Sequence, residues 1–134
     1  MHDFLLDEDV LLVGHVVTDF PGGIQAAFTA LMDSLPNPLQ RSYYGVSWMD
    51  EACNIVYVAA AEAFSPEEAA GYDPLTVPAG TYLARPVSGW RTRTDCIKDY
   101  FGEMMQDPAY DGRFPCVEWY QNDEELVLLV RKRQ

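Results

Sequence analysis

Glu118 has the neighbours in this sequence that most clearly point to chemistry. It lies in the stretch FPCVEWYQ, residues 114–121, and is followed directly by Trp119 and Tyr120. Neither this stretch nor the four residues after it contain Lys or Arg, so no cation close in sequence neutralises the carboxylate. A ring face attracts a cation by about 0.5–2 kcal/mol, and a carboxylate in low dielectric adds to that attraction. The pattern predicts contact with a positively charged ligand; a solvated or internally paired acid is the alternative.

Metal and nucleophile chemistry have weaker support. His2 and His15 are isolated, and the cysteines Cys53, Cys96 and Cys116 form neither a CxxC pair nor an even disulfide framework. We therefore expect free thiols, no metal site and no cofactor. No spacing places a nucleophile beside a base and an orienting acid, so no catalytic residue is predicted.

Length and charge narrow the class of protein. A chain of 134 residues with 49% hydrophobic residues can bury one core, which predicts a single domain over residues 1–134. Its 9 Lys and Arg against 21 Asp and Glu leave a net charge of −12, which repels phosphate backbones and disfavours direct nucleic-acid binding. The sequence shows neither an apolar run of about 18 residues nor a positively charged start. We expect no membrane contact and a cytoplasmic location.

Hydrophobic periodicity separates two helices from six strand-like runs. The helical stripes fall in residues 23–35, after the turn at Pro21, and in residues 92–107, before Pro108. The strand-like runs are residues 10–17, 42–48, 54–64, 75–87, 115–121 and 125–132. The order strand, helix, strand, strand therefore occurs twice.

This repeated order predicts a duplicated α+β fold. A shift of 73 residues lays Ile24, Phe28, Leu31 and Met32 on Ile97, Phe101, Met104 and Met105. Residues 10–64 and 75–132 would then be halves related by an approximate two-fold axis. They would form an antiparallel sheet with both helices on one face, and the opposite face would be open to a ligand at the junction of the halves.

Aromatic residues on the other predicted strands are the candidate walls of this pocket. Side chains alternate along a strand, so Cys116, Glu118 and Tyr120 share one side. In the first half, Tyr44, Val46 and Trp48 are expected to take the same side. The candidate ligand-binding residues are Glu118, Tyr82, Tyr57, Trp48, Tyr120, Tyr44 and Trp90. For each aromatic residue, ordinary core packing is the alternative.

Three ordered motifs resemble the GyrI-like, or AraC-type, effector-binding domain. They are LTVPAGTYLARPVSGW before the second helix, FPCVEWY before the closing hairpin, and SYYGVSW in the first half. The resemblance spans about residues 10–131. The chain departs from the family pattern at its end, where LLVRKRQ replaces an apolar-Pro ending, and it has no helix-turn-helix segment.

The resemblance implies a ligand pocket at the junction of two halves. Family members sense or sequester amphipathic, often cationic and aromatic compounds, and their ligand-facing glutamate matches Glu118. Tyr82 matches the tyrosine of the family's Pro-Ala-Gly-x-Tyr strand. The leading hypothesis is thus a stand-alone domain that binds a small hydrophobic cation. The sequence does not decide whether a separate DNA-binding protein uses this domain as its sensor.

Two alternatives come from the same resemblance. Some relatives hydrolyse strained electrophilic small molecules, and Glu118 would then polarise a water while Tyr82 or Tyr120 donates a proton. The other alternative is an acidic protein that inhibits a gyrase-like target by protein–protein contact.

Overall fold

The structure is a computed structural model that describes residues 1–19, 22–72 and 75–134. The strands are β1 (His2–Leu6), β2 (Val10–Val16), β3 (Tyr43–Met49), β4 (Ile55–Glu62), β5 (Leu75–Val77), β6 (Gly80–Ser88), β7 (Cys116–Tyr120) and β8 (Glu125–Arg131). The α-helices are α1 (Ile24–Ser34) and α2 (Ile97–Met104), and the 3-10 helices are η1 (Pro38–Gln40), η2 (Pro66–Gly71), η3 (Trp90–Thr92) and η4 (Thr94–Cys96). No helix in these ranges is long and apolar enough to cross a membrane.

The elements follow the predicted order with three differences. The strand β1 was not predicted, and the run expected over residues 75–87 is divided into β5 and β6 at Pro78, which lacks the N–H that a continuous ladder needs. The second helix is shorter than the predicted residues 92–107: it begins at Ile97, after the 3-10 helices η3 and η4, and it ends at Met104, because residues 105–107 continue as turns. The turn expected at Pro21 lies outside the described residues.

All eight strands form one antiparallel sheet in the order β1-β6-β8-β7-β3-β4-β2-β5. The pair β3–β7 lies at its centre. On one flank the order is β7-β8-β6, and on the other it is β3-β4-β2. The outermost strands cross over between the flanks, because β1 pairs with β6 and β5 pairs with β2.

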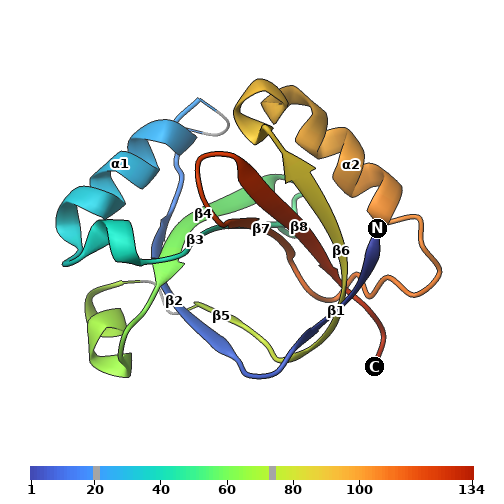
Figure 1. Ribbon diagram of the computed structural model, residues 1–134, viewed down its shortest axis with the longest axis horizontal. Helices are drawn as coiled ribbons and strands as arrows, with labels where there is room; N and C mark the ends of the chain where they lie inside the picture. Colours follow the sequence, from blue (N-terminus) through green and yellow to red (C-terminus); the bar gives the residue numbers. More distant parts are fainter. Residues whose placement is uncertain (20–21, 73–74) are drawn as a thin grey trace.

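The sheet curls, and both helices lie on its outer face (Figure 1). Inside the curl is a core that includes Leu12, Val46 and Val117, and it is also reached by Phe4 of β1 and Val77 of β5, from the two opposite edges. We expected the sheet face opposite the helices to be open to a ligand, but the curl of the sheet closes this face around a core. On the helix-bearing face, α2 packs through Phe101 and α1 through Leu31 on separate clusters.

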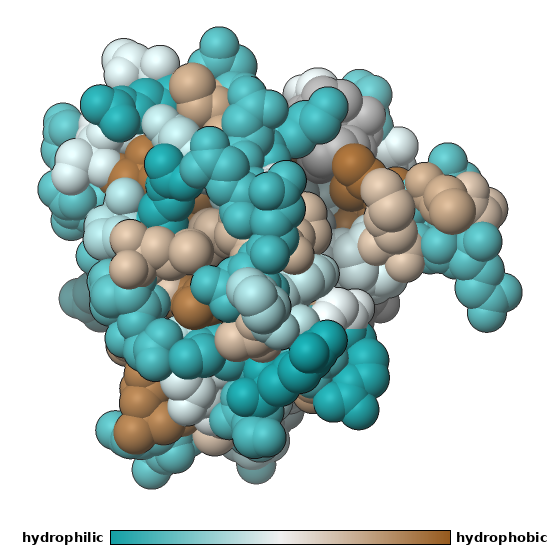
Figure 2. Space-filling view, turned by 90° about the vertical axis from the view of Figure 1, so that its right-hand side faces the viewer, coloured by the Kyte–Doolittle hydropathy of each residue, from teal (hydrophilic) through white to brown (hydrophobic). Residues whose placement is uncertain are grey.

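Hydrophobic side chains are scattered over the visible surface. In Figure 2 they gather in small patches among hydrophilic residues and on a projection at the right of the view. The large apolar residues that stay exposed include Leu39, Trp48, Met49, Ile55 and Met105. All five also line the cleft between the helices that is described below.

Candidate functional site

Glu118 lies on β7 near the centre of the sheet and is only 9% exposed. Its Oε1 accepts a hydrogen bond of 2.7 Å from the Tyr57 hydroxyl of β4 and one of 2.6 Å from the Tyr120 hydroxyl. Tyr120 reaches it because residues i and i+2 of a strand share a face. Tyr57 reaches it across β3, which lies between β4 and β7.

Gly45 makes the contact across β3 possible. It lies opposite Glu118 in the β3–β7 ladder and opposite Ala59 in the β3–β4 ladder. A Cβ atom at Gly45 would overlap the Tyr57 hydroxyl and lie 2.5 Å from Tyr57 Cζ and 2.6 Å from Glu118 Oε1. The missing side chain thus leaves the room in which the tyrosine and the carboxylate meet.

Burial controls the protonation of this group. Burial raises the pKa of Glu118, and the hydrogen bonds from Tyr120 and Tyr57 oppose that rise. Burial and the neighbouring carboxylate raise the pKa of Tyr57 and of Tyr120. They also raise the pKa of Cys116 to about 11. At neutral pH the two tyrosines and the thiol therefore keep their protons.

Glu118 forms no ion pair with any cation in the described ranges. Three arginines border the same cleft, but each is bound to another acid: Arg41 to Glu68, Arg91 to Asp123 and Arg113 to Asp111. Lys98 is an exposed residue of α2 at the border of the cleft. The carboxylate is thus stabilised by neutral hydroxyl donors alone among its described contacts.

The carboxylate lies on the floor of a cleft of about 1610 Å³ between the two helices. The walls come from the two helices and include Ile24, Phe28 and Met32 of α1 and Ile97, Phe101 and Met105 of α2. The floor comes from the sheet and includes Ser47, Tyr57, Cys116, Glu118 and Tyr120. One end is bordered by Met49, Ile55 and Phe114, and the other by Leu39, Trp90 and Asn122. Most of these side chains are apolar or aromatic, so Glu118 is an acidic group on a largely hydrophobic floor.

Aromatic rings from both halves of the chain surround Tyr120. The Phe28 ring of α1 lies 5.6 Å from it and the Trp90 ring lies 4.9 Å from it, both edge to face. Trp90 is held by a 3.0 Å hydrogen bond from its Nε1 to the Asn122 carbonyl. These contacts fix the ring whose hydroxyl binds Glu118.

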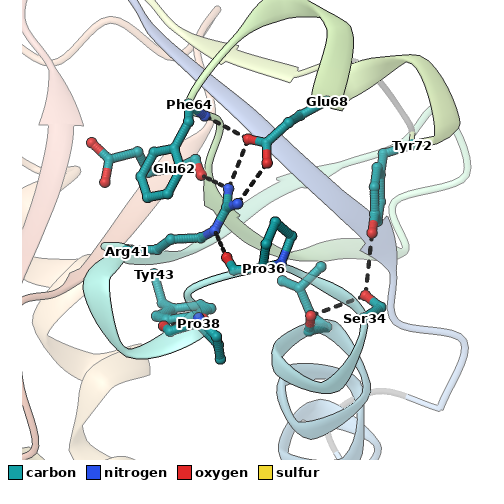
Figure 3. A network of polar contacts seen from close by, with 10 residues as sticks. Ser34, Pro36, Pro38, Arg41, Tyr43, Glu62, Phe64, Glu68 and Tyr72 are labelled. Atoms are coloured by element: carbon teal, nitrogen blue, oxygen red, sulfur yellow. Dashed lines mark hydrogen bonds and ion pairs between the residues drawn. The ribbon is translucent and has the colours of Figure 1, made fainter.

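Arg41, a buried arginine that also lines the cleft, is the centre of a network of polar contacts (Figure 3). The Arg41 guanidinium donates to the carbonyls of Pro36 and Glu62 at 3.0 and 2.9 Å and to both carboxylate oxygens of Glu68 at 2.9 and 2.6 Å. The hydrogen bonds from Arg41 lower the pKa of Glu68 to about 2. The network joins the segment before β3 to η2, and the Glu68 carboxylate neutralises the positive charge of Arg41.

The structure brings four of the seven predicted site residues together in the cleft, leaves a fifth at its border and separates two. Glu118, Tyr57, Tyr120 and Trp90 line the cleft, and Trp48, 38% exposed, borders it near the end of β3. Tyr44 and Tyr82 belong instead to the core inside the curl and are not among the residues that line the cleft.

The predicted strand parity of the first half was wrong. Gly45, not Tyr44 or Val46, lies opposite Glu118, so Tyr44 stacks with Trp119 at 6.3 Å on the other face. Tyr82 also points away: its hydroxyl donates to the Pro78 carbonyl at 2.5 Å and accepts a hydrogen bond of 3.1 Å from Arg131. Parity within one strand is read from sequence, whereas the register between two strands depends on their pairing.

Gly45 and Phe28 were missed as site residues. Phe28 was assigned only to the buried stripe of its helix, yet its ring also faces the cleft. A glycine inside a strand pattern is a signal of close approach by another group, and this signal could have drawn attention to Gly45. Over the described ranges, no group of three or more His, Cys, Asp or Glu side chains is placed to hold a metal ion.

Comparisons with known proteins identify the fold. No family model matches the chain, and no curated protein matches it. The integron cassette protein VCH_CASS2, from the mobile metagenome of Vibrio cholerae, has a similar structure: TM-score 0.72 and 13% identity over 98% of this chain and 95% of that one.

Two further solved structures share the fold. The protein SAV2435, bound to tetraphenylphosphonium, gives a TM-score of 0.69 and 14% identity over 98% of this chain and 93% of its own. A candidate bacterial transcription regulation protein from Staphylococcus aureus MU50 gives 0.60 and 13% over 99% and 97%. At these identities the likeness shows the fold alone.

Proposed function

We propose that this chain is a GyrI-like effector-binding domain that binds small hydrophobic cations in the cleft between α1 and α2. The observation that carries the proposal is the Glu118 carboxylate, which is buried on an aromatic floor and bound by two tyrosine hydroxyls without an ion partner in the described ranges. An ionised acid in such a place lacks the cation that would normally balance it. A ligand cation supplies that charge.

The apolar walls favour a ligand whose charge is carried on a hydrophobic body. The rings of Phe28, Trp90 and Tyr120 offer faces and edges at close range, and a cation over a ring gains about 0.5–2 kcal/mol. The similar fold of the tetraphenylphosphonium-bound protein supports this ligand class, and the candidate regulator supports a sensing role. In this proposal Glu118, Tyr57, Tyr120, Trp90 and Phe28 contact the ligand.

We also propose that the two halves arose by duplication, with the two-fold axis near the β3–β7 pair. The repeated element order and the matching strand orders on the two flanks support this view. The cleft then lies at the junction of the halves within one domain.

The test compares three ligands of related shape: tetraphenylphosphonium, neutral triphenylphosphine oxide and anionic tetraphenylborate. Isothermal titration of the parent should rank the cation first. Glu118→Gln keeps the shape and the acceptor oxygen, and it should weaken tetraphenylphosphonium about 10- to 100-fold while it changes the neutral ligand little. Glu124→Gln, the same change at an exposed acid, is the matched control. Equal affinity of the parent and Glu118→Gln for the cation would refute the proposal.

The hydroxyl contacts favour a second candidate, hydrolysis of an electrophilic small molecule. Tyr57 and Tyr120 both donate to Glu118, so a carboxylate that could act as a base and two hydroxyl donors lie together on the cleft floor. Glu118 would take a proton from the water as it attacks the electrophilic carbon, the carbon–oxygen bond would break, and Tyr120 would give its proton to the released oxygen and regain one from Glu118. Mass spectrometry of a strained electrophile, such as an epoxide, after incubation separates the candidates, because only an enzyme consumes its ligand.

A further inference from the structure

The cleft is longer than a compact cation requires. Tyr43 and Met49, the two end residues of β3, both line its floor, and at about 3.3 Å per residue they lie about 20 Å apart. Its volume of about 1610 Å³ exceeds the roughly 300–1,000 Å³ of sites for drug-sized molecules. An α-helix rises about 1.5 Å per residue, so a helix of about 13 residues has the length of this floor.

The end of the cleft beyond the carboxylate is apolar and exposed. Met49 and Ile55 lie opposite each other where β3 meets β4, and they are 65% and 48% exposed. Met49 is four residues along β3 from Gly45, the residue opposite Glu118, so its backbone lies about 13 Å further along the strand. We therefore expect a compact cation at the carboxylate to leave this end of the cleft free.

Three methionines line the cleft, one from each of three elements. They are Met32 of α1, Met49 of β3 and Met105 of α2. Unbranched, polarisable methionine side chains adapt to partners of differing shape and are common where helices dock in grooves. The same side chains would serve poorly as a rigid pocket for one small molecule.

Charge selects the kind of helix. Among the described residues, four basic side chains border the cleft: three arginines are held by Glu68, Asp123 and Asp111, and Lys98 is exposed on the α2 wall, whereas Glu118 is the buried acid on the floor. The chain as a whole carries −12. A docked segment would therefore need a basic side chain on its apolar face, and a basic outer face would add long-range attraction.

We propose that the cleft also docks an amphipathic helix of about 13 residues from a partner protein, with one Lys or Arg on the apolar face placed at Glu118. The role of Glu118 rests on the proposed function, whereas the extended groove and its apolar end do not. The partner helix and a small cation would then bind in competition.

The test uses a stapled helical peptide of about 13 residues. Leucines stand at i, i+3, i+7 and i+10, and a lysine at i+4 lies on the same face. Fluorescence anisotropy should show saturable binding that tetraphenylphosphonium displaces. Norleucine in place of the lysine should weaken binding about tenfold or more in the parent and little in Glu118→Gln.

The Met49→Ser, Ile55→Ser double variant separates the inference from the proposed function. Both side chains are largely exposed, so circular dichroism should show an unchanged fold. We expect it to weaken the peptide about tenfold or more and to leave tetraphenylphosphonium affinity within twofold. Tetraphenylphosphonium binding without peptide binding, or peptide binding insensitive to the double variant, would overturn the inference and leave the proposed function standing. Sedimentation velocity showing a dimer that the double variant dissociates would overturn it in favour of a second copy.

Discussion

Gly45→Ala adds a single methyl group at the point where the site is most crowded. The new Cβ would lie 2.5 Å from Tyr57 Cζ and 2.6 Å from Glu118 Oε1, whereas ordinary contacts are 3.4–4 Å. The Tyr57 ring must retreat by about 1–1.5 Å to regain ordinary contact distances, or the strands must separate. A retreat of that size stretches the 2.7 Å hydrogen bond between Tyr57 and Glu118 beyond bonding range.

Three free-energy terms set the expected loss of stability. Overpacking a rigid strand centre costs about 1–3 kcal/mol. Losing a hydrogen bond to a charged group costs about 1.5–3 kcal/mol. Replacing glycine restricts the unfolded chain and returns about 0.4–1 kcal/mol. We expect Gly45→Ala to lower the free energy of unfolding by about 2–5 kcal/mol and to weaken tetraphenylphosphonium.

The assay is urea unfolding followed by circular dichroism, with Gly102→Ala as the matched control. A Cβ at Gly102 in α2 meets nothing within 4 Å, so helix propensity should make that variant about 0.5–1 kcal/mol more stable than the parent. Adding Tyr57→Phe to Gly45→Ala removes the overlapping hydroxyl and should recover part of the loss. A Gly45→Ala protein with the stability and cation affinity of the parent would refute the reasoning.

Three further predictions concern pH, the arginine network and the core. Because burial raises the folded-state pKa of Glu118, the stability that the protonated acid contributes below its unfolded pKa of about 4.3 is lost as the pH rises through the folded pKa. The melting temperature of ligand-free Glu118→Gln should not show this loss. The same dependence of melting temperature on pH in the parent and the variant would contradict the prediction. Arg41→Lys keeps the charge but cannot reproduce the fork to Glu68 and two carbonyls, so urea unfolding should show a loss of about 1–3 kcal/mol, with Arg93→Lys, at an exposed site, as the neutral control. Met104→Ala leaves a cavity at a fully buried position of α2 and should lower the free energy of unfolding by about 2–5 kcal/mol in the same assay. Met105→Ala, at an exposed position, should lower it much less.

The sequence determined the local elements because their signals are local. The stripe from Ile24 to Leu35 and the one from Ile97 to Met105 each mark a helix, since residues three and four apart meet on one face. The alternation in residues 116–120 placed Glu118 and Tyr120 on one side of their strand, and the two hydroxyl bonds at Glu118 include the one from Tyr120. Glu118 and its aromatic neighbours could therefore be recognised as a candidate site from residues 114–121 of the sequence alone.

The tertiary structure decided which face carries the site and which aromatic residues reach it. A strand's own pattern does not say which residue of a partner strand lies opposite, and a slip of one residue exchanges the two faces. The β3–β7 pairing places Gly45 opposite Glu118. Tyr44 therefore points into the core, and Tyr57 of β4, two strands from β7, can reach the carboxylate. The curl of the sheet closes the other face around one core cluster, which includes Val77 and against which Phe4 packs, although the two residues are distant in sequence. The cleft is consequently a product of long-range packing, which residue spacing along the chain does not encode.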